Sequence, residues 1–222
     1  MADKPLRKNK RFNYDAVLGE NNPLLRFPLL FEEALNEFSE KLFREASLND
    51  ILKKANMSKS SLYYHFGDKF GLYLCLMDII VKKKLDYFIP RMKQLNKEHS
   101  FFDIIKKLSQ DTICFMLKDK RIHSLSTKLL GEDEILIKHI YEFFPYDYNA
   151  GFDPLIESAK ATGQIDKSYS TEFLTKLISI LFSNMYELLP TGKPEEVYPT
   201  VTRVFDILEN GVKPIEIKEK KQ

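Results

Sequence analysis

The side chains best suited to specific chemistry lie between positions 58 and 69, where hydrogen-bond donors follow one another closely. They are Ser58, Lys59, Ser60, Ser61, Tyr63, Tyr64, His65 and Lys69. Hydroxyls, phenols, an imidazole and ammonium groups can all donate hydrogen bonds to phosphate oxygens and to the edges of bases. Ser47 and Ser58 each fit the position before a helix, where a hydroxyl caps the helix or contacts a phosphate beside the free N–H groups. The pattern indicates recognition of a nucleic acid.

Patterns that would indicate catalysis are missing from the sequence. There is no HExxH, P-loop or GxGxxG, and the Ser, His and Asp residues follow no catalytic arrangement. Glu132, Asp133 and Glu134 with His139 can be imagined as metal ligands. Acidic residues at a helix start are more simply partners of the helix dipole. We therefore expect no enzyme activity, no cofactor and no metal site.

Three short helices are expected between Pro28 and Phe66 to position these donors. Pro28 suits a first helical turn, and Ser47 suits the N-cap of a second helix. Asn56 then interrupts the pattern with a residue that tolerates the left-handed conformation of a sharp turn. Ser58 begins the third helix. Two short helices joined by so tight a turn form a helix-turn-helix, which presents the start of its last helix to the major groove of DNA.

The remaining sequence also favours helices. Apolar periodicity predicts a long helix from Lys69 towards Pro90. Further helices are expected over Phe101–Lys118, Ile122–Leu130, Glu132–Phe144, Pro154–Ala161, Thr171–Leu189 and Val197–Leu208. Residues Phe12–Phe27 contain Gly, Asn and Pro and are expected as a loop, or as an arm with little structure of its own. No stretch alternates like a β-strand, so the predicted fold class is all-α.

Positive charge is concentrated in two stretches. The chain has 222 residues with 34 basic and 32 acidic side chains, and this near-balance argues against a protein coated with positive charge. Met1–Arg11 has five basic residues and one acidic residue, and Lys53–Lys97 is also basic. The first stretch is a candidate arm for the minor groove or for phosphates. A solvated tail is the alternative.

Composition excludes several classes of protein. At 44% hydrophobic, the chain can bury a sizeable core. No apolar run reaches the roughly 20 residues of a membrane span, and the N-terminus lacks the apolar core of a signal peptide. Cys75 and Cys114 form no CxxC motif. We expect a cytoplasmic protein with no membrane partner.

Two neighbouring stretches resemble the TetR family of bacterial transcription repressors. Phe38–Ile51 is similar to the family's first helix and the start of its second, and Ala55–Lys69 is similar to its turn and recognition helix. The most diagnostic part is Leu-Tyr-Tyr-His-Phe, residues 62–66, followed three residues later by Lys69. The resemblance implies a helix-turn-helix that binds a double-stranded DNA operator.

The resemblance also assigns roles to individual residues. Lys59, Ser60 and Ser61 would face the major groove. Tyr63 and His65 would donate to phosphates, Tyr64 would touch a thymine methyl or a base edge, and Lys69 would pair with a backbone phosphate. With the two helix caps, the predicted DNA-binding residues are Ser47, Ser58, Lys59, Ser60, Ser61, Tyr63, Tyr64, His65 and Lys69. The alternatives are a core tyrosine at Tyr63, a surface or capping histidine at His65 and an ordinary solvated lysine at Lys69.

The sequence departs from the family pattern at four positions. Family members usually have Gly where Leu42, Asn56 and Ser60 stand, and Glu where Phe70 stands. Asn56 can meet the same backbone need, whereas Leu42 implies a different turn between the first two helices. Ser60 adds a side chain at a position where the resemblance implies a close approach of the backbone to phosphate. Phe70 predicts a more deeply buried start of the fourth helix.

The expected organisation has four parts. Residues 1–27 form a basic and partly flexible arm, residues 28–70 the helix-turn-helix domain, residues 71–214 a larger helical effector-binding and dimerisation domain, and residues 215–222 a basic tail.

The apolar sector of Thr171–Leu189 is too wide for one core face. Together with Val197–Leu208, this helix suggests a homodimer interface; a fully buried helix is the alternative. By resemblance, Leu72–Ala161 would enclose a small-molecule effector.

The function expected from these observations is a dimeric repressor that binds a palindromic operator and is released by an effector. A helical ligand-binding or interaction module that has lost DNA affinity is the main alternative, and a small helical enzyme comes third.

Overall fold

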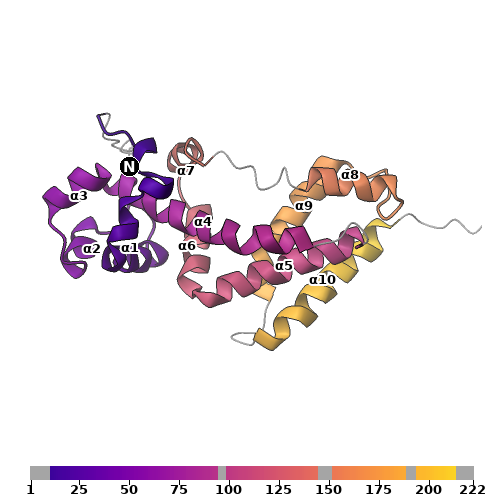
Figure 1. The fold of residues 1–222 in the computed structure, drawn as a ribbon. Helices are drawn as coiled ribbons and strands as arrows, with labels where there is room; N and C mark the ends of the chain where they lie inside the picture. The colour runs from indigo at the N-terminus through magenta and orange to yellow at the C-terminus, as the bar shows by residue number, and fades with distance from the viewer. Residues whose placement is uncertain (1–10, 95–98, 145–151, 189–193, 214–222) are drawn as a thin grey trace, which may run out of the picture. The chain divides into compact units, whose positions relative to one another are not determined.

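The computed structural model describes residues 11–94, 99–144, 152–188 and 194–213, and every regular element within them is helical. This confirms the all-α fold class. The α-helices are α1 (Pro28–Glu40), α2 (Leu48–Lys54), α3 (Lys59–Phe66), α4 (Lys69–Gln94), α5 (Phe101–Lys118), α6 (Lys120–Leu130), α7 (Glu134–Tyr141), α8 (Asp153–Ala161), α9 (Thr171–Asn184) and α10 (Val197–Val212), as Figure 1 shows. Short 3-10 turns are η1 (Asp15–Val17), η2 (Gly19–Asn21), η3 (Pro23–Arg26), η4 (Met185–Leu188) and η5 (Pro194–Glu196).

The helices group into two compact units. The first comprises the chain up to Tyr87 together with Asp119–Tyr146, and the second comprises Phe88–Lys118 and the chain from Asp147 onward. The first unit therefore includes α6 and α7 beside the three N-terminal helices. The functional boundary expected after residue 70 is a different division and remains a prediction. Among the described residues, no helix is long and apolar enough to cross a bilayer.

The core of the first unit includes several large aromatic side chains beside its leucines and isoleucines. Phe38, Phe66, Phe70 and Tyr73 are each at most 2% exposed. Phe38 and Tyr73 meet edge to face with ring centroids 4.8 Å apart. Burying a side chain of this size stabilises a fold by about 1.5–3 kcal/mol, and the edge-to-face geometry adds to that. The burial of Phe70 is the deeper start of α4 that the sequence predicted.

The turn between α2 and α3 has the predicted left-handed residue. Asn56 has a φ of 51°, and it is the one positive-φ residue other than glycine among those described. Its N–H donates to Lys53 O at 3.3 Å, and the next N–H, of Met57, donates to Leu52 O at 2.9 Å. These two bonds are the Schellman pattern, which satisfies the last carbonyls of a helix and turns the chain sharply.

The N-terminal segment is more ordered than the sequence suggested. A loop or loose arm was expected over Phe12–Phe27, but η1, η2 and η3 occupy it, and the Gly19 N–H of η2 donates to Asp78 of α4 at 2.8 Å. The Tyr14 hydroxyl donates to Asp68 at 2.7 Å, and the Asn22 amide donates to Cys75 O at 2.8 Å. These partners are more than 50 residues away, so no local pattern could reveal them. Residues 1–10, with most of the basic arm, lie outside the described residues.

Phe12 lies directly over the end of α3. Gly67 follows that helix with a φ of 76°, and a Cβ there would come within 2.5 Å of the Phe12 ring. Glycine is needed here both for the backbone conformation and for the close approach of the ring. The segment preceding α1 therefore covers the junction between α3 and α4.

Several helix ends differ from the sequence-based boundaries, among them ends of α4, α7 and α9. The long helix α4 continues through Pro90 to Gln94 rather than ending at the proline. The helix expected over Glu132–Phe144 is shorter, because Asp133 caps α7 through the Leu136 N–H at 3.0 Å. The helix expected over Thr171–Leu189 becomes 3-10 from Met185. Such shifts at helix ends are common, since local capping and tertiary packing decide them.

The conformation of Asn56 leads to a test of the turn. Asn56→Ala should lower the free energy of unfolding by about 1–2 kcal/mol, because a Cβ without a compensating polar group disfavours the left-handed region. Asn56→Gly should change it by less than ~1 kcal/mol, because glycine adopts this conformation freely. Urea unfolding measures both, and equal losses for the two variants would show that backbone strain is not the cause.

Candidate nucleic-acid interface

Helix α3 has one fully buried face and one exposed face. Leu62 and Phe66, four residues apart, are 0% exposed and fix the helix against the core. Because successive helical residues are rotated by about 100°, the residues between them must point elsewhere. Tyr63 is 55% exposed and Tyr64 is 79% exposed. Tyr63 is thus not the core tyrosine considered as an alternative, and both phenols are available to a partner.

The N-terminus of α3 is capped by the residue predicted for it. The Ser58 hydroxyl accepts a hydrogen bond from the Ser61 N–H at 3.1 Å. Ser47 caps α2 in the same way, accepting from the Asp50 N–H at 3.2 Å. A capping hydroxyl still has its own proton to donate, so capping leaves both serines able to contact a phosphate. Lys59 and Ser60 are exposed in the first turn of α3, and Ser61 is partly buried.

His65 lies beside aromatic rings. Its ring centroid is 5.1 Å from that of Phe27 and 4.8 Å from that of Tyr64. The imidazole is half-buried. These contacts restrict the orientation of the imidazole, which lies at the edge of the exposed face of α3.

Lys69 is directed differently from the prediction. Its ammonium donates to Ala46 O at 2.8 Å and Arg44 O at 3.4 Å, and it lies 4.7 Å from the centre of the Phe43 ring. Burial lowers the pKa of this ammonium, while Glu132 and Glu37 act in the opposite direction. The lysine is partly buried, and its ammonium is directed at these carbonyls rather than at an external phosphate. It binds the chain that leads into α2.

Glu37 is a positioning residue that the sequence analysis missed. It is 5% exposed. Its carboxylate accepts from the Ser47 N–H at 2.7 Å and from the Lys41 ammonium at 2.7 Å. Burial alone would raise the pKa of Glu37, but these two bonds hold it below its ordinary value. An i, i+4 pairing of Glu37 with Lys41 was visible in the sequence, whereas the bond to Ser47 was not.

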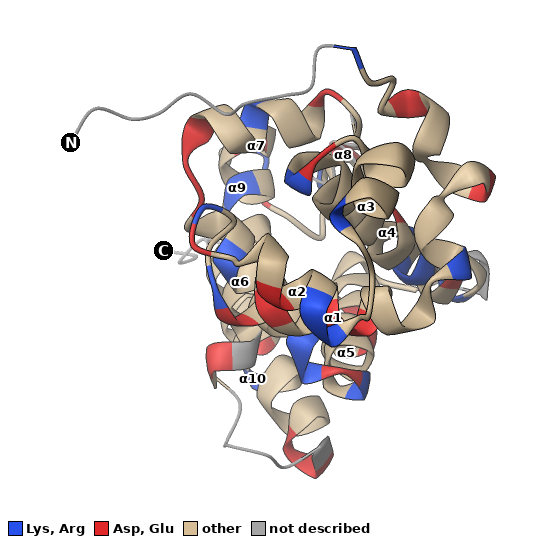
Figure 2. Ribbon diagram, turned by 90° about the vertical axis from the view of Figure 1, so that its left-hand side faces the viewer, with Lys and Arg blue, Asp and Glu red and all other residues tan. Residues whose placement is uncertain are grey.

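Charge on the candidate surface comes from few residues. Figure 2 shows α3 largely free of charged residues, with lysine or arginine and acidic residues both present around α1 and α2. The exposed cations of α2 and α3 are Lys53, Lys54 and Lys59. Lys53 and Lys54 lie in the last turn of α2. These three lysines are the exposed cations that α2 and α3 present to a phosphate backbone.

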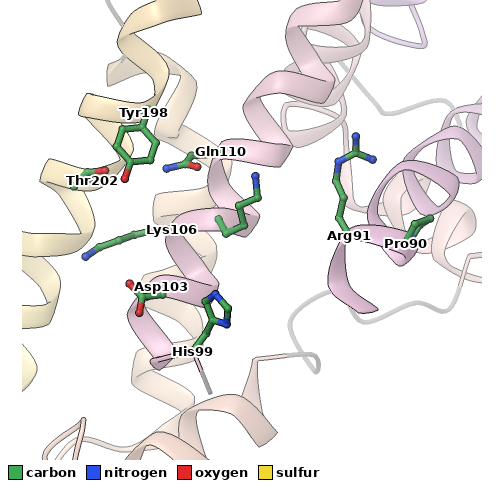
Figure 3. Close-up of a pocket in the computed structure, with 9 residues that line it drawn as sticks. Pro90, Arg91, His99, Asp103, Lys106, Gln110, Tyr198 and Thr202 are labelled. Carbon is green, nitrogen blue, oxygen red and sulfur yellow. The ribbon is translucent and has the colours of Figure 1, made fainter. Parts of the chain in front are cut away.

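A separate, polar cavity lies within the second unit. Its volume is about 670 Å³. Figure 3 shows side chains around it from α4, α5, α10 and the chain before α5. The lining residues are Pro90, Arg91, His99, Asp103, Lys106, Lys107, Gln110, Tyr198 and Thr202. Lys106 is held by Asp206 at 2.6 Å and by Glu209 at 3.2 Å, so much of its charge is already neutralised.

The N-terminal helices match a known family of bacterial regulators. Residues 30–75 match the family model described as bacterial regulatory proteins, tetR family. An uncharacterized HTH-type transcriptional regulator of Bacillus subtilis, YvdT, is 22% identical over 189 residues, covering 84% of this chain and 95% of the relative. IcaR of Staphylococcus aureus, a negative transcriptional regulator of the biofilm operon icaADBC, is 43% identical over 75 residues, which is 34% of this chain and 38% of IcaR.

Solved structures share the fold over most of the chain. A TetR family transcriptional regulator from Chloroflexus aurantiacus has a TM-score of 0.71 and 21% identity, with 88% of this chain and 96% of that chain covered. The regulator FadR from Bacillus subtilis, in complex with stearoyl-CoA, has a TM-score of 0.64 and 15% identity, with 84% and 99% covered. At these identities the likeness concerns the fold.

Lys59 and Lys69 lie in different environments, and this difference leads to a prediction about DNA binding for each of them. Lys59→Ala should reduce the slope of log K against log salt concentration by about 0.9 per half-site, because it removes an exposed cation from the first turn of α3. Lys69→Met should leave the slope unchanged and lower the melting temperature, because its ammonium bonds carbonyls of the protein itself. Titrations at four salt concentrations measure the slopes, and a reduced slope for Lys69→Met would restore it as a phosphate contact.

Proposed function

We propose that this chain, which belongs to the tetR family of bacterial regulatory proteins, is a homodimeric repressor that binds a palindromic operator and releases it when a small molecule binds. Members of the family are transcriptional regulators and not enzymes. The observation on which the proposal depends is the exposed face of α3. Tyr63 and Tyr64 lie on this face, and Ser58 caps the N-terminus of the helix. The opposite face of α3 is buried in the core.

The exposed tyrosines support contact with DNA. Two neighbouring phenol rings left largely open to water are an apolar surface, and such patches mark interaction sites when they are held on a rigid element. Tyr64, the more exposed of the two, is the candidate for a thymine methyl or a base edge. Ser58, Lys59 and Ser60 are the candidates for phosphates and bases at the helix start. A single α3 offers few contacts, so useful specificity requires two half-sites.

A second copy of the chain would supply the second half-site. On α9, Phe173 is 52% exposed and Ile180 is 60% exposed, and more than two helical turns further along Leu188 in η4 is 54% exposed. On α10, Ile207 is 75% exposed. The opposite faces of both helices are buried in the second unit's core through Leu174, Ile178, Val201 and Phe205. Each helix thus has an apolar face left over after its own core is filled, and a matching face on another copy would cover it.

Repression and release are inferred from relatives. IcaR is named as a negative regulator, and the FadR structure contains stearoyl-CoA. The cavity of the second unit is where we would look first for an effector. Its charged and hydroxyl-bearing walls suit a small polar ligand better than a long acyl chain. A ligand that binds one conformation more tightly would shift the population away from the DNA-binding form.

A direct test of DNA binding separates this function from a helical module that no longer binds DNA. The full-length protein is used to select sequences from a random duplex library, and the selected operator is titrated with variants. Tyr64→Ala should weaken operator binding about tenfold or more through the lost base contact. Tyr141→Ala is the matched control, because Tyr141 on α7 is 55% exposed but distant from α3 in the sequence. Failure to select any sequence, with the protein folded, would favour the module.

The dimer can be tested without DNA. Ile180→Asp should shift the protein to a monomer at micromolar concentration, because a carboxylate in a closed apolar interface is costly to bury. Ile135→Asp, on the exposed face of α7, is the control and should leave the mass unchanged. Sedimentation equilibrium measures both. A wild-type protein that sediments as a monomer at micromolar concentration would refute the dimer.

A further inference from the structure

The loop between α1 and α2 is held by side chains from other elements. Glu37 of α1 accepts from the Ser47 N–H, and Lys69 of α4 donates to the carbonyls of Arg44 and Ala46. The fourth group is the Phe43 N–H, and its partner is the carboxylate of Glu132 at 2.5 Å. Ser47 ends this loop and caps α2. The position of the α2 N-terminus therefore depends on contacts from three separate elements.

Glu132 comes from the turn between α6 and α7, 89 residues from Phe43. Its side chain is partly buried, and burial raises the pKa of the carboxyl, while the bond from the Phe43 N–H opposes the shift. Burying a carboxylate costs free energy unless hydrogen bonds compensate for the lost water. The Phe43 N–H supplies one such bond, and the nearby Lys69 ammonium adds a favourable charge interaction.

The residues on both sides of Glu132 contact the same loop. Asp133 accepts from Arg44 Nε at 3.2 Å while its other oxygen caps α7. Leu42 Cδ2 lies 3.8 Å from where a Cβ of Gly131 would be. Three successive residues of the α6–α7 turn thus meet three successive residues of the α1–α2 loop. Helix α6 itself packs against α1, and Arg121 donates to Asn36 Oδ1 at 2.7 Å.

We propose that Glu132 is a positioning residue for DNA binding, which holds the Phe43 N–H and thereby keeps Ser47 and the start of α2 where they can meet a phosphate. The proposal rests on the proposed function, since it assigns a DNA-binding role to a residue outside the matched helices. It makes operator affinity depend on the α6–α7 turn. In the chain, the segment with α6 and α7 lies between two stretches that belong to the second unit.

A purely electrostatic effect and a positioning role predict opposite changes in operator affinity when the Glu132 carboxylate is removed. Loss of a negative charge close to a DNA-binding surface should tighten binding to a polyanion. Loss of the hydrogen bond that holds the loop should weaken it. The sign of the change in affinity therefore separates a positioning role from a mere charge effect.

The test compares three variants of the full-length protein on the operator selected by the wild type. Glu132→Ala should bind about tenfold more weakly, the loss expected when a hydrogen bond to a charged group is removed. Glu132→Gln keeps an acceptor oxygen for the Phe43 N–H and should recover most of the affinity. Glu134→Ala removes the same charge from an exposed site two residues away and should bind as the wild type does, or slightly more tightly.

Amide hydrogen exchange on the free protein supplies the second readout. The Phe43 N–H should lose protection in Glu132→Ala and regain it in Glu132→Gln, while the amides of α5 and α10 stay protected, which shows that the fold is intact. Wild-type or tighter binding by Glu132→Ala would overturn the inference and leave the proposed function standing. Equal weakening by the Ala and Gln variants would also overturn it. A wild type that selects no operator would refute the proposed function itself.

Discussion

The complete burial of Leu62 and Phe66 is the constraint on which the candidate recognition surface depends. With both side chains enclosed, α3 can neither rotate about its axis nor slide, and the helical repeat then places Tyr63 and Tyr64 in water. The aromatic core beneath, with Phe38, Phe70 and Tyr73, fills space that a mobile helix would leave open. The pair of exposed tyrosines therefore lies on a firmly held helix rather than on a loosely folded end.

The two connections within the helix-turn-helix are stabilised by different means. The α2–α3 turn satisfies its own backbone through the Schellman bonds around Asn56. The α1–α2 loop instead relies on Glu37, Lys69 and Glu132, which come from three elements. The first connection is therefore local and stiff, whereas the second responds to the position of α4 and of the α6–α7 turn. Regulation can act on a connection of the second kind, because its geometry depends on the rest of the fold.

Much of the fold could be predicted from the sequence because its signals are local. The helix caps at Ser47 and Ser58, the left-handed Asn56, the buried Phe70 and the exposed Tyr64 all follow from neighbouring residues and helical periodicity. The order of Phe12–Phe27 could not be predicted, since Tyr14 and Asn22 find their partners on α4 and at its start. The roles of Glu37 and Glu132 were missed for the same reason, and Glu132 had been interpreted as a partner of a helix dipole rather than as a metal ligand.

By itself the sequence determined the helical class, the helix-turn-helix and the residues that α3 exposes, because short-range backbone hydrogen bonding and a 3.6-residue repeat govern these features. Only the tertiary structure decided what the long charged side chains do. Lys69 was expected at a phosphate and instead binds the carbonyls of Arg44 and Ala46. A flexible side chain bonds whichever acceptors the fold brings within reach, and here those acceptors lie more than 20 residues away in the sequence.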